Sequence, residues 1–151
     1  MASEQFPNEG LAYLLGIVPK GGTSPANLYL GLFTSQTATT VLTVTQTLAA
    51  NITEPGYTNY ARVAVASSDW GSVLATDTIW TQTPVSSVTA SQKSFAAAGS
   101  VQSSALNGFF LASAITGGVC VFQSNWDDQT AIASLQLGDI VRVTPKFALG
   151  G

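Results

Sequence analysis

The sequence predicts a mostly β protein: an antiparallel β-sandwich or jelly-roll-like domain with one short N-terminal helix. Several short apolar runs of strand length are separated by turn residues, which is typical of such folds. Strands do not alternate with long helical patterns, which disfavours a parallel sheet with crossover helices. The chain has 151 residues and a hydrophobic content of 46%, enough for a core of its own. We therefore expect residues 1–151 to form a single domain.

The N-terminal end of the chain predicts an arm and then a helix. Residues 1–8 are expected to be a flexible arm. Apolar residues then recur at the spacing i, i+3, i+4, i+7, namely Leu11, Leu14, Leu15 and Val18. This spacing predicts an amphipathic helix over residues 9–18, with these side chains on its buried face. Asn8 is placed to be the N-cap, and Pro19 ends the helix.

The remainder, residues 27–147, is expected to form the sandwich. Short apolar or alternating runs predict strands at residues 27–34, 60–65, 78–82, 91–97, 109–112, 119–122 and 141–144. The pair Gly117-Gly118 between two of these runs predicts a hairpin. The Thr- and Ser-rich segments 35–53 and 85–104 are candidates for long surface loops that touch partners, and in segment 35–53 a strand containing Val41, Val44 and Leu48 is the alternative.

The charge content narrows the choice of partners. Charged residues make up 9% of the chain, against roughly 25% in ordinary globular domains. The five basic residues are scattered and the net charge is −3, so we expect binding neither to nucleic acid nor to a membrane. Neutral polar groups lose less hydration than ions when they are covered. The composition therefore favours a surface that other protein chains cover.

Few residues in this chain can carry out chemistry. There is no histidine and a single cysteine, Cys120, which lies in an apolar run and is interpreted as buried. We therefore expect no cofactor, no metal site built on histidine or thiolates, and no enzymatic activity. The carboxylates beside turns are Glu54, Asp69, Asp77, Asp127, Asp128 and Asp139. We expect these side chains to cap backbone groups in the turns. The alternative is that two of them form the catalytic pair of a glycosidase. Asp127-Asp128 also leaves an ion site open, without the spaced-acid loop of a specific calcium site.

Aromatic residues are the candidates for protein–protein contact, because interface anchors tend to be aromatic. The candidate interface residues are Phe6, Tyr13, Tyr57 and Trp126. Trp70 and Trp126 lie near turns, where a sugar-binding platform is the alternative to ordinary core packing. Trp80 lies within a predicted strand and is expected to be structural.

The order of segments resembles a known class of proteins. Residues 28–34 read Leu-Tyr-Leu-Gly-Leu-Phe-Thr, and Gly56-Tyr57 is followed by Tyr60-Ala61-Arg62-Val63. A stretch beginning at Asn107-Gly108 and a terminal run from Leu137 to Val143 complete the pattern. It resembles small virion proteins of tailed bacteriophages, of the head decoration (cement) or tail-fibre-like kind. The resemblance covers most of the chain and rests on strands and turns.

The resemblance implies a β-domain made in the host cytoplasm and assembled into the virion. It implies a capsid decoration protein, a homotrimer that binds the major capsid protein and stabilises the assembled head. The chain has no coiled-coil heptads or fibrous repeat, which disfavours the shaft of a fibre. The alternative is a tail-fibre or tail-adaptor component that binds a host surface glycan or other tail proteins.

Overall fold

The chain is mostly β, as the sequence predicted, with antiparallel sheets and one helix near the N-terminus. The computed structural model describes residues 4–5, 8–17, 19–36, 48, 52–77, 85–99, 104–126 and 132–149. Every strand pair formed by these residues is antiparallel. The sandwich or jelly-roll arrangement stays an interpretation, because the described strands divide into one large and three small sheets.

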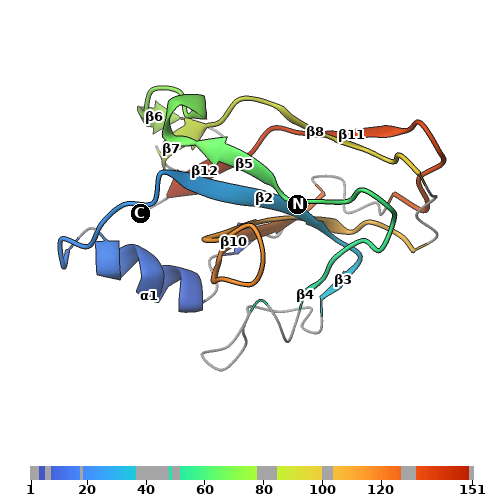
Figure 1. Ribbon diagram of the computed structural model, residues 1–151. Helices are drawn as coiled ribbons and strands as arrows, with labels where there is room; N and C mark the ends of the chain where they lie inside the picture. The colour runs from blue at the N-terminus through green and yellow to red at the C-terminus, as the bar shows by residue number, and fades with distance from the viewer. Residues whose placement is uncertain are drawn as a thin grey trace.

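The largest sheet has five strands in the order β1-β10-β9-β2-β5 (Figure 1). Its strands are β1 (Glu4–Gln5), β2 (Asn27–Phe33), β5 (Val63–Ala66), β9 (Gly108–Ala112) and β10 (Cys120–Asn125). The hairpin predicted around Gly117-Gly118 is confirmed, because β9 pairs with β10. Both glycines have positive φ, 60° and 79°, a region that L side chains rarely adopt. Glycine therefore closes this connection without strain.

The remaining strands form three small sheets. They are β3 (Ser35–Gln36) with β4 (Ile52–Thr53), β8 (Lys93–Ala96) with β11 (Ile140–Val143), and β7 (Val85–Thr89) between β6 (Leu74–Asp77) and β12 (Lys146–Leu149). A short 3-10 turn at Ser67–Asp69 joins β5 to the segment that leads into β6. The two sheets that contain β6 and β8 lie on one side of the five-stranded sheet (Figure 1).

Several strand predictions differ from the structure. Segment 85–104, expected as a surface loop apart from the strand at 91–97, also contains β7, because β12 from the far end of the chain pairs with it. The strand predicted over 91–97 is confirmed as β8. The strand expected over 60–65 begins only at Val63. Strand β12, just after the strand expected over 141–144, was not predicted. The strand expected at 78–82, with Trp80, lies outside the described residues.

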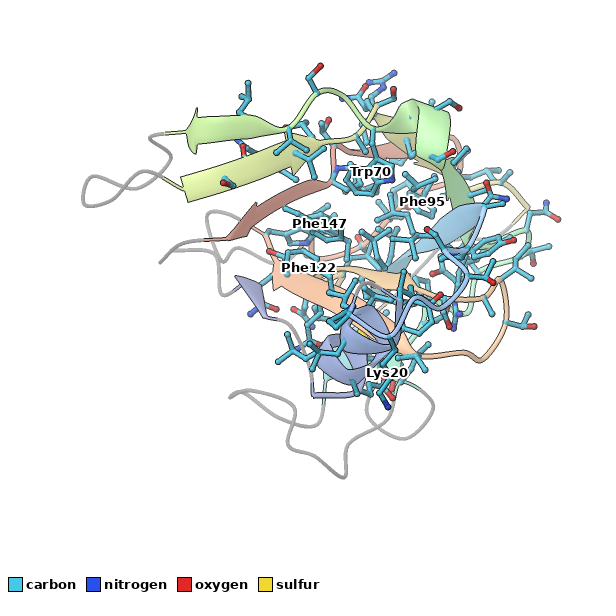
Figure 2. The ribbon with its side chains drawn as sticks, turned by 90° about the vertical axis from the view of Figure 1, so that its left-hand side faces the viewer. Lys20, Trp70, Phe95, Phe122 and Phe147 are labelled. Carbon is cyan, nitrogen blue, oxygen red and sulfur yellow. The ribbon has the colours of Figure 1, made fainter. Side chains whose placement is uncertain are left out.

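The main core lies between the five-stranded sheet and the two sheets beside it. Figure 2 shows Trp70, Phe95, Phe122 and Phe147 gathered in this space. The Phe122 and Phe147 rings pack edge to face at 4.8 Å, and Trp70 stacks on Phe147 at 5.0 Å. Full burial of one such side chain contributes about 1.5–3 kcal/mol, so this aromatic group does much to hold the sheets together.

The other face of the five-stranded sheet carries a second, smaller core. Its buried residues are Phe33, Leu48, Phe110, Ala112 and Cys120. Along β9, residues alternate between the two cores, as the two-residue repeat of a strand requires. This strand is therefore apolar on both faces, which explains the continuous apolar run in its sequence.

Helix α1 (Asn8–Ile17) packs against β10, but on a different face from the one predicted. Leu11 and Leu15, expected to be buried, are 43% and 60% exposed. Gly10 is buried instead, and a Cβ there would lie 2.7 Å from the Cys120 carbonyl oxygen and still nearer that of Val121. The helix therefore approaches the strand through its glycine, and this close contact turns the two leucines outward.

The expected N-terminal arm also contributes structure. Glu4 and Gln5 form β1, which pairs with Ser124 and Gln123 of β10. Asn8, expected as the N-cap, is the first residue of α1. The start of the chain thus adds an edge strand and a helix to the same strand of the main sheet.

Candidate interaction surface

The described surface exposes seven large apolar side chains. They are Leu11, Leu15, Val73, Leu74, Ile115, Leu137 and Ile140, each at least 43% exposed. Leu11 and Leu15 lie one helical turn apart on the outer side of α1. Because 9% of the chain is charged, few ions are available to surround these side chains. This exposed apolar pair on one side of α1 is therefore a candidate site of association.

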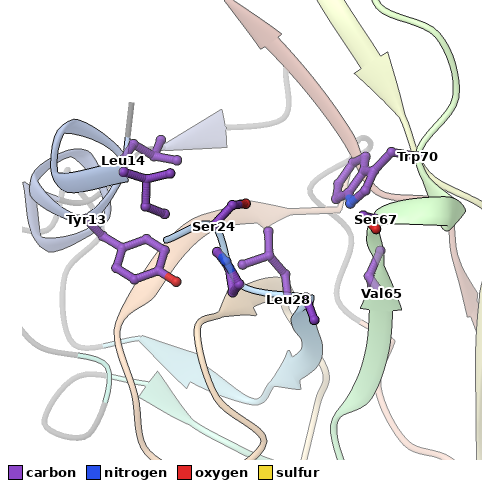
Figure 3. A pocket seen from close by; sticks show the side chains of 10 residues that line it. Tyr13, Leu14, Ser24, Leu28, Val65, Ser67 and Trp70 are labelled. Atoms are coloured by element: carbon purple, nitrogen blue, oxygen red, sulfur yellow. The ribbon is translucent and has the colours of Figure 1, made fainter. Parts of the chain in front are cut away.

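A pocket of about 250 Å³ lies between α1 and the sheet (Figure 3). It is lined by Tyr13, Leu14, Ile17, Ser24, Pro25, Ala26, Leu28, Val65, Ser67 and Trp70. None of these residues is charged, and the only hydroxyls come from Tyr13 and the two serines. Figure 3 shows Tyr13 on the helix side of the pocket and Trp70 on the opposite side. We call this pocket together with Leu11 and Leu15 the α1 surface.

The structure brings one predicted interface aromatic to this surface. Tyr13 lines the pocket. Tyr57 is 5% exposed and meets the Tyr60 ring edge to face at 5.4 Å, so it has little surface to offer a partner. Trp126 is half-buried: its indole N–H donates to the Leu106 carbonyl oxygen at 2.8 Å. Phe6 lies outside the described residues. The interface role of all four stays a prediction.

The Trp70 ring contacts the aromatic core and also lines the pocket of the α1 surface. It stacks on Phe147 with an angle of 18° between the planes. The core role predicted for Trp70 therefore accounts for one side of the ring. The pocket side leaves the sugar-platform alternative open for this tryptophan.

A second hollow, of about 440 Å³, lies beside Arg62 and the loop between β9 and β10. The buried Arg62 guanidinium pairs with Glu54, with Nη2 2.5 Å from Oε1. Its Nη1 donates to the carbonyl oxygens of Ala114 and Gly117 at 2.8 and 2.7 Å, and its Cζ lies 5.0 Å from the centre of the Phe110 ring. One side chain thereby fixes the loop that presents Ile115, which is 54% exposed.

The described carboxylates serve the fold. Glu54 is held by Arg62, and Asp139 accepts a hydrogen bond from the Gln136 N–H. Asp69 accepts from the Ala66 N–H and from Lys93, both at 2.7 Å, and these bonds hold its pKa below the usual range. The prediction that turn carboxylates cap backbone groups is confirmed for Asp69 and Asp139.

The other carboxylates offer no further detail. Asp77 is the last residue of β6. Asp127 and Asp128 lie outside the described residues, and so does the ion site that the sequence left open for this pair. Within the described part of the chain, no three acidic or cysteine side chains gather as metal ligands would.

Cys120 is fully buried, as predicted. Burial raises the pKa of its thiol far above the usual range, and the Glu9 carboxylate nearby acts in the same direction. Its Sγ donates to the Phe122 carbonyl oxygen at 3.5 Å. The thiolate, which is the nucleophilic form, is thereby strongly disfavoured.

Sequence reasoning missed two features of this region. The bonds from Arg62 to backbone carbonyls join residues more than fifty positions apart, and no local pattern reports them. Gly10 did leave a signal, because glycine inside a helix costs stability and is kept where another backbone comes close.

No protein-family model matches this chain, and a search of curated proteins finds no similar sequence. None of the helices in the described part of the chain has the length and apolar character needed to span a bilayer.

Proposed function

We propose that this protein is a structural component of a tailed-phage virion, a capsid decoration (cement) protein that binds the assembled head. It acts by packing against other chains and performs no catalysis. The proposal combines the resemblance of its strand and turn motifs with the apolar, weakly charged surface. The observation that carries it is the α1 surface: Leu11 and Leu15 are exposed on the outer side of α1, and an uncharged pocket lies between α1 and the sheet.

The proposed mechanism is mass action. A protein that binds the assembled shell but not its dissociated subunits stabilises the shell by the free energy of that binding. Apolar surface buried at the contact contributes about 25 cal/mol per Å² before the costs of association are subtracted. Leu11, Leu15 and the pocket are suited to this kind of contact, because burying them leaves no charge without a partner.

The test is binding to heads that lack the protein. Leu11→Ser with Leu15→Ser should weaken binding at least tenfold, because two apolar anchors are lost. The matched control is Val73→Ser, which removes a 69% exposed apolar side chain from outside the α1 surface. Binding of the control should stay within about twofold of the parent. Equal binding by all three proteins would contradict the role of the α1 surface, and no binding by the parent would contradict the proposal itself.

The same assay distinguishes apolar from ionic contact. With so few ions, binding should change little between about 0.05 and 0.5 M salt, because screening acts on exposed charges. A steep loss of affinity with salt would indicate that ion pairs carry the contact and would oppose the mechanism proposed above.

Trp70 supports a second candidate function. One side of its ring lines the pocket with Tyr13 and Ser67, an arrangement that suits stacking on a sugar ring. On this alternative the protein is a tail-fibre or tail-adaptor component that binds a host surface glycan. Antibody labelling of virions separates the two candidates: label over the head supports a decoration protein, and label at the tail supports the alternative.

A further inference from the structure

We propose that the N-terminal segment, residues 4–17, is exchanged between copies of this chain, so that β1 and α1 of one copy lie on β10 of the next. The partner is a second copy, because an identical segment makes identical bonds at the same strand. The inference concerns self-assembly alone and does not depend on which particle, if any, the protein binds.

The segment is held to the rest of the chain mainly at one strand. β1 pairs with β10 through Glu4 opposite Ser124 and Gln5 opposite Gln123. One carboxylate oxygen of Glu9 accepts hydrogen bonds from the Cys120 N–H at 2.6 Å and the Leu48 N–H at 3.1 Å. The segment thus covers the edge of β10 with a strand and then with a side chain, and the same edge would accept the same groups from another copy.

Beyond β10 the segment fits its own chain loosely. The pocket of about 250 Å³ separates Tyr13, Leu14 and Ile17 from the sheet, and Leu11 and Leu15 face outward. This pocket opens to solvent, so Tyr13, Leu14 and Ile17 are only partly buried. The free energy that keeps the segment on its own copy therefore comes mainly from the β1 pairing, the Glu9 hydrogen bonds and the close approach of Gly10, which a second copy reproduces in full.

The connection from α1 to β2 has the character of a hinge. Residues 19–24 are exposed, and they include Pro19 and the positive-φ residue Gly21. The Gly22 N–H donates to the Gly16 carbonyl oxygen at 3.2 Å, which ties the connection to the helix and not to the sheets. Among the described residues, the next backbone hydrogen bond to the rest of the chain is at Ala26, whose carbonyl oxygen accepts a hydrogen bond from the Ser67 N–H. Helix and strand can therefore leave together as one unit.

Exchange changes little in the segment's own contacts. The bonds to β10 are lost within one copy and regained on another. The equilibrium between monomer and exchanged assembly therefore depends on new contacts between the two copies and on protein concentration. Leu15 lies within one helical turn of the hinge, where an exchanged chain must cross between copies. Burial of this 60% exposed side chain there favours the assembled form.

A disulfide placed across β1 and β10 tests the exchange directly. Glu4→Cys with Ser124→Cys joins two paired positions, in a Cys120→Ala background that leaves no other thiol. The matched control joins Arg142→Cys with Ser94→Cys, paired positions of β11 and β8, both outside the segment. The protein is concentrated, passed through denaturant and refolded to reach equilibrium, separated by size, and oxidised.

The expected result is a covalent link between chains in the assembled fraction of the Glu4→Cys, Ser124→Cys protein, seen without reducing agent. Its monomer fraction should be linked within the chain, and the control should be linked within the chain in every fraction. An assembled fraction linked only within chains would overturn the exchange, and so would the absence of any assembled fraction. The assay contains no particle, so its failure is distinct from a failure to bind heads.

A second variant covers the case in which the cysteine pair fails to fold. Deletion of residues 20–23 shortens the connection by up to roughly 13 Å of extended chain. A segment that can no longer return to its own β10 still reaches that of another copy, so the assembled fraction should rise. A folded protein that is monomeric at every concentration would contradict the proposal.

Discussion

The hydroxyl of Tyr60 bonds to both backbone groups of Leu32. It accepts a hydrogen bond from the Leu32 N–H at 2.9 Å and donates one to the Leu32 carbonyl oxygen at 3.2 Å. The pairing of β2 with β5 ends where Leu30 faces Val63. The hydroxyl therefore bonds the backbone of Leu32, two residues further along β2, in place of a strand partner. This substitution explains why the strand expected over 60–65 starts late: Tyr60 completes the sheet with its side chain and not with its backbone.

Tyr60→Phe removes both bonds while keeping the ring. It should lower the free energy of unfolding by about 1–3 kcal/mol, because two backbone groups of a buried strand lose their partner. Urea titration measures the change, and Tyr13→Phe, which removes a hydroxyl at the pocket, is the control with an expected change below about 0.5 kcal/mol. Equal stability of the parent and Tyr60→Phe would show that the hydroxyl has no structural role.

The same tyrosine makes stability depend on alkaline pH. Burial, with a smaller effect of the nearby Glu54 carboxylate, raises the pKa of Tyr60 far above its ordinary value of 10.0. The folded state therefore keeps a proton that the unfolded chain releases above about pH 10. This contribution to stability is complete below pH 10 and falls as the pH rises beyond it.

The measurement is the free energy of unfolding between pH 8 and about pH 11. Tyr57, whose pKa burial also raises, adds to the decline in the same direction. Tyr60→Phe should flatten the fall relative to the parent, and Tyr57→Phe should flatten it less. Stability that rises above pH 10 would have the wrong sign for this assignment.

Arg62 should be the charged residue whose loss costs the most stability. Arg62→Met leaves the Glu54 carboxylate and the carbonyl oxygens of Ala114 and Gly117 without their donor. The cost should approach, but stay below, the roughly 3–5 kcal/mol of a fully buried ion pair, because the Glu54 side chain is 29% exposed. The amides of residues 113–119 should also exchange hydrogen faster, because the guanidinium holds this loop in place.

Arg142→Met is the matched control, because Arg142 lies exposed on β11. It should change the free energy of unfolding by no more than about 0.5 kcal/mol and leave exchange in the β9–β10 loop as it was. If the two substitutions cost the same, Arg62 holds the loop no more firmly than an ordinary surface residue would.

The two glycines of α1 should respond in opposite directions to alanine. At Gly10 a methyl group meets the carbonyl oxygens of Cys120 and Val121, so Gly10→Ala should destabilise the protein by about 1–3 kcal/mol. A Cβ added at Gly16 would meet no atom within 4 Å, so Gly16→Ala should stabilise the protein by up to about 1 kcal/mol through helix propensity. Thermal unfolding of both variants is the measurement. A gain at both positions would mean that α1 does not dock through Gly10.

These residues also show what the sequence can and cannot predict. The hairpin at Gly117-Gly118 was predictable because the strands and the turn are neighbours in sequence. The buried face of α1 was not, because it depends on β10, more than a hundred residues away. Strand β7 was expected to be a loop, because its Ser- and Thr-rich sequence is ordered by pairing with β12, about sixty residues further along the chain. Strand β8 was predictable from the alternation around Phe95.

The sequence predicted the character of the candidate surface but not its position. The low charge content predicted a surface suited to protein contact, and composition is visible in any sequence. The position of the α1 surface was not predictable, because Leu11 and Leu15 fit a buried helical face as well as an exposed one. Their exposure follows from the close approach of Gly10 to β10, a contact made only in the folded chain.

Cys120 should be inert in the folded protein and reactive once the chain unfolds. The thiol is fully buried and its pKa is raised, so a thiol reagent reaches it only when β10 separates from its neighbours. An opening free energy of about 4 kcal/mol slows labelling about a thousandfold relative to a free thiol. Thr116→Cys in a Cys120→Ala background is the control, because position 116 is exposed in the β9–β10 loop and should label at the rate of a free thiol. Fast labelling of Cys120 below the unfolding transition would mean that the β10 region opens readily, and the tight docking of Glu9 and Gly10 on this strand would then be wrong.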